Sequence, residues 1–244
     1  MIPLKGKVAL VTGASKGIGR ASALMLAEGG ANIVIGATSS DLLEMLKRDI
    51  ESLGVESLAE RCDVTRLPDC EGLVQRSLQR FGKIDILINN AGVGFSGKIV
   101  DSDPKEAEQM VMVNVLGVYY MTRAVLPSMM EQQGGDIINI GSVASLKYSP
   151  NFAMYSATKF AVRAFSEALR NEVQGHNIRV TLIHPGMTKT TFFDSFTQGG
   201  SPVPLDKGEI LKPEDIANAI HFALTRPQGV SLNEVTVRPI WQER

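Results

Sequence analysis

The chain has 244 residues, of which 44% are apolar and 21% charged, a composition that fits one soluble globular domain and excludes a disordered chain. Its 25 Lys and Arg residues balance 26 Asp and Glu residues, so no global charge favours nucleic acid or a membrane as partner. Cys62 and Cys70 have neither a metal-ligand nor a redox-pair spacing, and the histidines are scattered, so we expect no metal site and a cytoplasmic location. We expect no signal peptide, because the apolar run before Gly13 is too short, and no transmembrane segment.

The first predicted strand, Lys7 to Thr12, leads into a glycine-rich loop and then a helix expected from Ala21 to Glu28. In this context glycines let the backbone approach a diphosphate, and the free N–H groups at the helix start bind its charge. A Walker loop is excluded, because no Gly-Lys-Ser/Thr stands at the required spacing after Gly13. The sequence therefore predicts a dinucleotide loop formed by Gly13, Ser15, Lys16, Gly17, Ile18 and Gly19.

The end of the second predicted strand, Asn32 to Gly36, determines which ribose the fold accepts. An acidic residue there would repel a 2′-phosphate, but none is present. The hydroxyls of Thr38 and Ser39 can donate to a phosphate, and Lys16 brings a positive charge nearby. These residues favour NADP(H) as the cofactor. In the alternative, Lys16 is a solvated lysine and the hydroxyl residues only cap a helix that begins at Asp41.

Helices and strands then alternate, with helices expected over 41–53 and 68–81 and strands over 57–62 and 84–88. This alternation predicts an α/β Rossmann fold in a single domain over 1–244, with a doubly wound, seven-stranded parallel sheet and helices on both faces. Ligands bind such sheets at the carboxyl ends of the strands, where Asp63 and Asn90 stand. We expect Asn89 to bridge neighbouring strands through its amide, while Gly92 lets the backbone approach a ligand or simply turn.

A long helical region from Pro104 to Met130 carries Asn114 in its middle, which predicts a kink, a bound water or a function. Further strands are expected over 136–140, 179–184 and 234–238, and the first of them delivers Ser142 at its end. His184 ends another of these strands with no acid or nucleophile in register. We therefore interpret it as a satisfied core residue.

Tyr155 and Lys159 stand four residues apart on a helix expected to open at Ser149-Pro150, so they share one face. A fixed ammonium beside Tyr155 would lower the phenol pKa toward neutral pH, which suits an acid catalyst. Ser142 can hold a carbonyl oxygen while Tyr155 protonates it, if the fold brings the two together. The alternative is a solvated helix pair and a turn serine, since Tyr-x-x-x-Lys occurs by chance in many helices.

The segment 188–212 is long for a connection in a compact domain, and we interpret it as a substrate lid. Phe192, Phe193 and Phe196 support this interpretation, because a disordered linker would seldom carry three aromatic residues. In the alternative, these rings pack on a neighbouring subunit.

Four motifs, in this order and spacing, resemble those of the short-chain dehydrogenase/reductase family over essentially the whole chain. They are Thr12 to Gly19, Asn89 to Gly92, Ser142 with Tyr155 to Lys159, and Pro185 to Thr188. The resemblance implies that Tyr155 is the general acid/base and that Ser142 holds the carbonyl. It also implies that Lys159 lowers the Tyr155 pKa and bonds the nicotinamide ribose, and that Asn114 keeps a proton-relay water.

The same resemblance implies the cofactor contacts along the chain. Asp63 and Val64 would lie at the adenine, and Asn90, Ala91 and Gly92 along the cofactor. The motif containing Pro185, Gly186 and Thr188 would then meet the nicotinamide, with Thr188 at the carboxamide.

Two substrate classes remain open. Up to Lys159 the chain resembles 3-oxoacyl-carrier-protein reductases, but its end, Asn233 to Gln242, is more similar to NADP-dependent 3-hydroxy acid dehydrogenases and small-carbonyl reductases. An acidic carrier protein favours a basic rim, yet Glu131 and Glu172 precede the strands that lead to the site. The expected function is an NADPH-dependent reductase, reversible to an alcohol dehydrogenase, of a small ketone or 3-oxo acid derivative. A carrier-protein reductase and a non-catalytic NADP-binding regulator are the alternatives.

The helical regions 104–130 and 150–173 carry apolar residues on more than one face, including Met110, Val111, Tyr119, Tyr120, Phe152, Phe160 and Phe165. One face of each covers the sheet, so a second apolar stripe would remain exposed in a monomer. We therefore expect a homo-oligomer, a tetramer with dihedral symmetry. In the alternative, the extra residues pack beneath the 188–212 segment of the same subunit.

Overall fold

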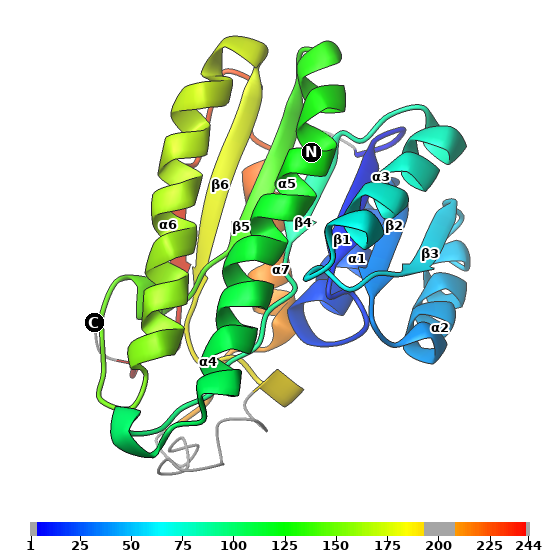
Figure 1. The fold of residues 1–244 in the computed structure, drawn as a ribbon. Helices are drawn as coiled ribbons and strands as arrows, with labels where there is room; N and C mark the ends of the chain where they lie inside the picture. The colour runs from blue at the N-terminus through cyan, green and yellow to red at the C-terminus, as the bar shows by residue number, and fades with distance from the viewer. Residues whose placement is uncertain (1–3, 193–207, 243–244) are drawn as a thin grey trace.

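The computed structural model describes residues 4–192 and 208–242, which form a seven-stranded parallel sheet between two layers of helices (Figure 1). The strand order is β3-β2-β1-β4-β5-β6-β7, so the direction of winding reverses between β1 and β4. The strands are β1 (Val8–Thr12), β2 (Asn32–Ala37), β3 (Ser57–Arg61), β4 (Ile86–Asn89), β5 (Gly135–Ile140), β6 (Ile178–Pro185) and β7 (Glu234–Val237). This confirms the predicted doubly wound sheet, in which ligands bind outside the carboxyl ends of the strands.

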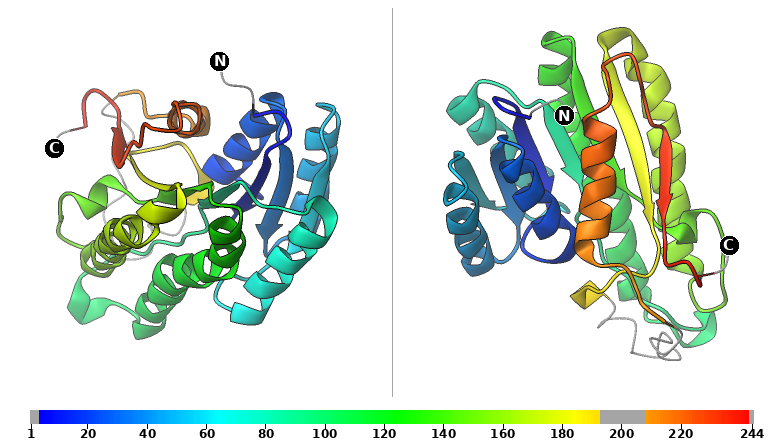
Figure 2. Two further views of the ribbon diagram at one scale, coloured as in Figure 1. Left: turned by 90° about the horizontal axis from the view of Figure 1, so that it is seen from above. Right: turned by 180° about the vertical axis from the view of Figure 1, so that it is seen from behind.

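Helices cover both faces of the sheet (Figure 2). The helices are α1 (Gly17–Glu28), α2 (Ser40–Glu51), α3 (Leu67–Phe81), α4 (Pro104–Val111), α5 (Gly117–Glu131), α6 (Ala153–Val173) and α7 (Pro213–Leu224). One apolar cluster joins α1, α2 and α7 to the sheet, and a second joins α3, α5 and α6 to its other face. The β-branched residues of the central strands are buried from both sides, as the continuous apolar runs predict.

Helix α7 is an element that the sequence reasoning left unassigned. Pro213 stands in its first turn, and the Asp215 carboxylate accepts a hydrogen bond of 2.7 Å from the Lys212 backbone N–H. Ile216 and Ile220 are fully buried, one helical turn apart. A proline and two acids followed by apolar residues at this spacing form a recognisable helix start, so the signal was present in the sequence.

Helix α6 begins at Ala153 rather than at the predicted Ser149-Pro150. The backbone of Asn151 is left-handed, with φ of 69°, and its carbonyl accepts a hydrogen bond of 2.8 Å from the Gly97 N–H. A left-handed residue cannot continue an α-helix, so the helix starts after it. The catalytic candidates on α6 are unaffected, because they lie farther along the helix.

The helical region from Pro104 to Glu131 is continuous but changes character at Asn114. Residues Met112–Leu116 form a π-helical turn between α4 and α5, which confirms the local irregularity predicted at Asn114. By length and composition alone this 28-residue helix could cross a membrane. Met121, Val125 and Met129 are nevertheless fully buried in the cluster on the sheet, the packing of a core helix.

Asn89 bridges neighbouring elements, as predicted. Its amide donates to the Asn139 side chain on β5 at 2.9 Å and to the Thr122 hydroxyl on α5 at 3.0 Å. All three side chains are buried, so these bonds satisfy polar groups that water cannot reach.

Candidate active site

A cavity of about 1230 Å³ opens at the carboxyl ends of the strands. Most of the predicted site residues line it: Gly13, Ser15, Lys16, Gly17, Ile18, Thr38, Asn90, Ala91, Gly92, Ser142, Tyr155, Lys159, Pro185, Gly186 and Thr188. Five predicted residues are not part of the lining: Gly19, Ser39, Asp63, Val64 and Asn114. The fold therefore brings together predicted residues from the loops after β1, β2, β4, β5 and β6, from the start of α1 and from helix α6.

The loop after β1 is held in place by the loop after β4. The Asn90 side chain donates to the carbonyls of Thr12 and Gly13 at 2.9 and 3.0 Å, and the Thr12 hydroxyl accepts from the Asn90 and Ala91 N–H groups. Gly13 has a φ of 60°, and a Cβ there would lie 2.7 Å from the Ala91 Cα. Thr12 is thus a positioning residue that the sequence reasoning quoted within a motif without assigning it a role.

Helix α1 begins at Gly17, inside the glycine motif, rather than at the predicted Ala21. Gly19 therefore belongs to its first turn, where a Cβ would lie 2.4 Å from the Asn90 amide nitrogen. Gly19 allows the two loops to pack closely and does not itself line the cavity. The N-cap residue of α1, Lys16, makes no side-chain capping hydrogen bond, and a helix start of this kind offers its first N–H groups to a ligand.

The candidates for cofactor selection lie at the end of β2. Thr38 is exposed and lines the cavity with Lys16. Ser39 is the N-cap residue of α2, but its side chain makes no capping hydrogen bond. The structure thus gives no support to the alternative in which the hydroxyl of Ser39 only caps the helix.

Asp63 and Val64 lie outside the cavity lining, after β3. The Asp63 carboxylate accepts hydrogen bonds from the backbone and hydroxyl of Thr65 at 3.0 and 2.7 Å. Val64 packs against Gly117, where a Cβ would lie 2.7 Å from its side chain. Both residues shape the turn after β3.

Tyr155, Ser142 and Lys159 meet at one wall of the cavity. All three are more than nine-tenths buried, and the Tyr155 phenol is hydrogen-bonded to Ser142. The Lys159 ammonium lies 5.8 Å from the centre of the Tyr155 ring and donates to the Ile140 carbonyl at 2.9 Å. Ser142 lies at the end of β5, where its hydroxyl also accepts from the Ala144 N–H at 3.1 Å.

The pKa of Tyr155 differs from the sequence prediction. Burial raises the pKa of the phenol to about 12, although its hydrogen bond with Ser142 acts in the opposite direction. Burial also lowers the pKa of Lys159 to about 8, because the charged ammonium loses its water. The predicted depression of the Tyr155 pKa by Lys159 is therefore wrong for this structure: desolvation of the phenol outweighs its hydrogen bond with Ser142, and the pKa rises.

Asn114 holds the loop after β4 against helix α6. Its side-chain oxygen accepts from the Val93 N–H at 2.9 Å, and its amide donates to the Val93 carbonyl at 2.9 Å and the Thr158 hydroxyl at 3.1 Å. The Thr158 hydroxyl in turn bonds the Tyr155 carbonyl at 2.8 Å. The side chain of Asn114 thus connects the loop to the backbone that carries Tyr155.

His184 lies behind Ser142 and is fully buried, which confirms the predicted core position but not the prediction that its polar atoms are all satisfied. Its Nδ1 lies 2.7 Å from the Ser145 hydroxyl and 3.2 Å from the Ser142 carbonyl oxygen. Its Nε2 lies 3.4 Å from a Glu234 carboxylate oxygen without forming a hydrogen bond within the described residues. Burial lowers the pKa of His184, so the ring is neutral at pH 7 and fixes the turn that presents Ser142.

The two ends of the predicted lid, at Thr188 and Leu211, are joined by backbone hydrogen bonds. Thr188 forms a parallel bridge with Leu211, supported by a hydrogen bond of 2.7 Å from the Lys189 N–H to the Leu211 carbonyl. The Phe192 ring lies 5.9 Å from the Tyr155 ring. Phe193, Phe196 and the rest of 193–207 lie outside the described residues, so the lid stays a prediction.

Several lining residues escaped the sequence reasoning, among them Val93, Phe152, Met187, Arg238 and Gln242. Arg238 and Gln242 follow β7 and reach the site only because that strand pairs with β6. Among the described residues, no group of three His, Cys, Asp or Glu side chains is arranged to hold a metal ion.

Comparison with known proteins identifies relatives over the full length of the chain. The family model for short chain dehydrogenases matches residues 7–199. An uncharacterized oxidoreductase of Staphylococcus aureus is 38% identical over 240 residues, which cover 98% of this chain and 100% of the relative.

Two solved structures are also similar. A serine dehydrogenase complexed with NADP+ has a TM-score of 0.91 and 32% identity over 97% of this chain and 96% of its own. The 3-ketoacyl-(acyl-carrier-protein) reductase of Brucella melitensis, complexed with NADH, has a TM-score of 0.87 and 33% identity over 96% of this chain and 98% of its own.

Proposed function

Because the chain belongs to the short-chain dehydrogenase/reductase family, we propose that it is an NADPH-dependent carbonyl reductase, reversible to an alcohol dehydrogenase. The substrate would be a small ketone or a 3-oxo acid derivative. The observation that carries this proposal is the meeting of Tyr155, Ser142 and Lys159 at one wall of a cavity with a glycine-rich loop at its other end. Hydride chemistry needs a proton donor and a bound nicotinamide in one site, and this cavity has room for both.

The residues present fit a dinucleotide. Gly13 and Gly17 have positive φ values of 60° and 54°, so the loop adopts a backbone that other residues rarely tolerate. The uncapped start of α1 presents N–H groups and a positive dipole end to the same cavity. Lys159 lies close to Gly92, where a Cβ would be 3.8 Å from its ammonium, and in the proposal it bonds the nicotinamide ribose.

In the proposed reaction, the bound cofactor supplies the hydride. Tyr155 donates its phenolic proton to the carbonyl oxygen, and Ser142 holds that oxygen by a hydrogen bond. A phenol with a pKa of about 12 remains protonated at neutral pH and is still more acidic than the alcohol that forms. Burial excludes water from the donor, and Asn114 maintains its position through Thr158.

NADPH is the proposed cofactor because Lys16 and Thr38 line the cavity without a carboxylate beside them. One of the similar structures is complexed with NADP+ and the other with NADH, so kinetic measurements with both cofactors test the preference. We expect a higher kcat/KM with NADPH than with NADH, and a reversed preference in Ala37→Asp, because a carboxylate there repels the 2′-phosphate. Equal efficiencies for the two cofactors in the unmodified protein would refute the assignment.

A panel of small ketones, 3-oxo acids and a 3-oxoacyl-carrier protein, each assayed by NADPH absorbance, tests the function itself. Oxidation with the small compounds supports the proposal, whereas turnover of the carrier-bound substrate alone supports the carrier-protein reductase. Tight NADPH binding without any turnover would identify a cofactor-binding regulator.

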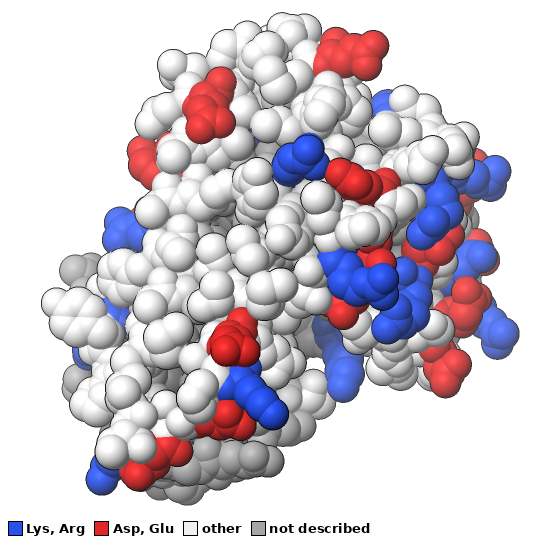
Figure 3. Space-filling view, in the orientation of Figure 1, with Lys and Arg blue, Asp and Glu red and all other residues white. Residues whose placement is uncertain are grey.

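We also propose a cytoplasmic homotetramer. Tyr119 and Val111 are exposed on the helical face, where charged residues are sparse over α5 and α6 (Figure 3). An exposed apolar face of this kind is typical of a subunit interface. Light scattering should give four times the chain mass of 26.4 kDa, and an active species of the chain mass would contradict the tetramer.

A further inference from the structure

The segment after β7 forms part of the active-site wall. The Gly186 N–H donates to the Val237 carbonyl at 2.6 Å, and the Gln242 side chain accepts from the Met187 N–H at 3.0 Å. The Trp241 indole donates to the Glu209 carbonyl at 2.7 Å. The segment is therefore hydrogen-bonded to the loop after β6 and to Glu209, near the end of the 188–212 region.

Arg238 lies in this segment and lines the same cavity as Tyr155. Its Cβ is close to Gly186, where a Cβ would lie 2.5 Å from it, so the base of the side chain is fixed. Within residues 4–192 and 208–242, neither an ion pair nor a hydrogen bond of the Arg238 guanidinium is present. Arg163, Arg170 and Arg179 of the neighbouring elements, by contrast, are each paired with a carboxylate.

The described lining of the cavity carries only positively charged side chains, although the whole chain is nearly neutral. Its described lining contains Lys16, Lys147, Lys159 and Arg238 but neither Asp nor Glu. Lys16 belongs to the glycine loop and Lys159 to the catalytic wall, so the proposed cofactor and chemistry account for both. Of the other two, Lys147 and Arg238, the half-buried Arg238 has no carboxylate partner among the described residues, and a guanidinium binds a carboxylate in a planar, bidentate manner.

We propose that Arg238 binds the carboxylate of the substrate, so that the enzyme acts on a small free oxo or hydroxy acid. This inference rests on the proposed function and specifies its substrate class. A neutral ketone lacks the anion, and a carrier-bound thioester has replaced the carboxylate. Both should be poorer substrates than the free acid, since a buried charge left without its partner weakens binding.

The experiment compares acetoacetate with methyl acetoacetate, which differ in the charge. The unmodified protein should prefer the acid. In Arg238→Met, kcat/KM for acetoacetate should fall by about 10- to 100-fold through KM, the range expected for a lost charge-assisted hydrogen bond, while the ester changes far less. Arg238→Lys should retain part of the preference, because it keeps the charge without the planar fork.

Lys147→Met serves as the matched control, because Lys147 is a cation of the same cavity lining. A loss in Lys147→Met equal to that in Arg238→Met would overturn the assignment. So would a rise in the KM for NADPH rather than for acetoacetate, which would place Arg238 at the cofactor. Equal efficiency of acid and ester in the unmodified protein would refute the carboxylate site while the carbonyl reductase activity stands.

A binding measurement tests Arg238 independently of turnover. Calorimetric titration of butyrate into the protein saturated with NADP+ should show binding that weakens by about 10-fold or more in Arg238→Met. If butyrate binds but neither acetoacetate nor methyl acetoacetate is reduced, the result contradicts the proposed function but supports the carboxylate site. Equal binding to both proteins, or binding to neither, would overturn the inference.

Discussion

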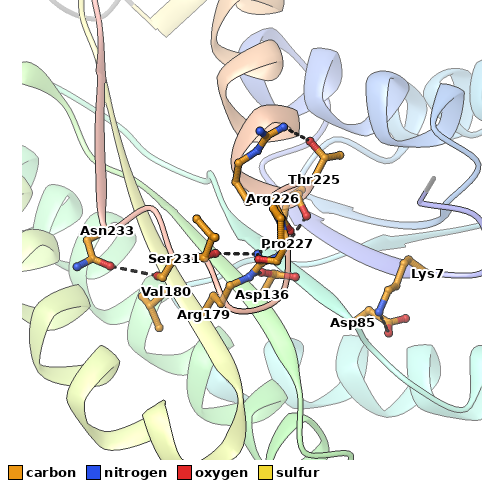
Figure 4. Close-up of polar contacts among 12 residues, drawn as sticks. Lys7, Asp85, Asp136, Arg179, Val180, Thr225, Arg226, Pro227, Ser231 and Asn233 are labelled. Carbon is orange, nitrogen blue, oxygen red and sulfur yellow. Dashed lines mark hydrogen bonds and ion pairs between the residues drawn. The ribbon is translucent and has the colours of Figure 1, made fainter. Parts of the chain in front are cut away.

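The charged residues at the amino ends of the strands differ in their pairing from those at the carboxyl ends. At the amino ends of the strands, Lys7 pairs with Asp85 at 3.0 Å and Arg179 with Asp136 at 2.6 Å (Figure 4). Lys83 also pairs with Asp85 at 3.0 Å. At the carboxyl ends, the described cavity lining holds cations without any carboxylate. The first edge of the sheet pairs Asp85 and Asp136 with cations, whereas the described cavity lining at the second edge contains neither Asp nor Glu.

The pKa values of Asp85 and Lys159 follow this contrast, whereas burial raises the pKa of Asp136 despite its pair with Arg179. Burial alone would raise the pKa of Asp85, but hydrogen bonds from Lys83, the Val8 N–H and Lys7 outweigh it and lower the pKa. Lys159 has only the Ile140 carbonyl and no carboxylate as a described partner, and burial lowers its pKa to about 8. Ionised Asp85 therefore stabilises the fold, whereas protonated Lys159 destabilises it. In the proposed function, the lost stability accompanies a charge placed where the cofactor and substrate would bind.

The largest expected effect is on turnover at the catalytic edge. Tyr155→Phe removes the proposed proton donor, and kcat should fall by about 10²- to 10⁴-fold. NADPH binding, measured by nucleotide fluorescence, should stay close to that of the unmodified protein, since only one hydroxyl is lost. A variant with full activity would show that another group supplies the proton.

At the opposite edge, Arg179→Met should destabilise the fold with little effect on chemistry. Arg179 binds Asp136 and donates to the carbonyls of Leu224, Arg226 and Val230. Its loss leaves a largely buried carboxylate alone, so the free energy of unfolding should fall by about 2–4 kcal/mol in urea denaturation.

Arg123→Met is the matched control for this variant. It removes a pair with Glu71 in which both side chains are about half exposed, so its effect should be below about 1 kcal/mol. Similar losses in the two arginine variants would show that burial does not distinguish the two edges.

Lys159→Met should separate stability from activity. The pKa of Lys159 is lowered from 10.5 to about 8 by burial, so below pH 8 the folded state holds an ammonium that is better solvated when unfolded. Replacing it should raise the free energy of unfolding at pH 7 by about 1–3 kcal/mol while turnover is lost. In the unmodified protein this deficit should shrink between pH 8 and 10.5, and the variant should lack that change. If Lys159→Met is less stable than the unmodified protein at pH 7, the claim that the buried Lys159 charge destabilises the fold is wrong.

The last expected effect is on pH dependence, and it is absent at neutral pH. The kcat/KM for NADPH, which reports groups of the free enzyme, should fall about tenfold per pH unit above about pH 8 as Lys159 loses its proton. Tyr155 stays protonated throughout, because its pKa is about 12. Lys159→Arg should shift the fall beyond pH 10, since a guanidinium keeps its proton there. A flat profile to pH 10 would exclude Lys159 as the titrating group.

Local sequence patterns were sufficient for the sheet, the glycine loop and the pairing of Tyr155 with Lys159, whereas Ala91, Pro185, Gly186 and Thr188 were predicted from the family resemblance. The glycine loop, the strand ends and the helical pairing of Tyr155 with Lys159 depend on short-range spacing, which the sequence displays directly. Helix α7 was predictable from Pro213 and its buried isoleucines but was overlooked. The late start of α6 depends on the left-handed Asn151, a conformation that only the packed loop reveals.

The features of the site that could not be predicted from the sequence depend on burial and on contacts between residues far apart in the chain. Spacing places Lys159 beside Tyr155 but says nothing of the desolvation that raises the Tyr155 pKa. Arg238 is far from Tyr155 in the sequence and reaches the cavity through the pairing of β7 with β6. Thr12 and His184 act on the site through hydrogen bonds between distant strands and turns, and those become visible only in the folded chain.

The most direct test of the central claim is the fate of the hydride. Reduction of acetoacetate with NADPH deuterated at the transferred position of the nicotinamide should give 3-hydroxybutyrate with one deuterium at the former carbonyl carbon, measured by mass spectrometry. Tyr155→Phe should form this product at a rate lower by about 10²- to 10⁴-fold. Deuterium-free product, or NADPH oxidation without any alcohol, would contradict hydride transfer at the carboxyl edge of the sheet.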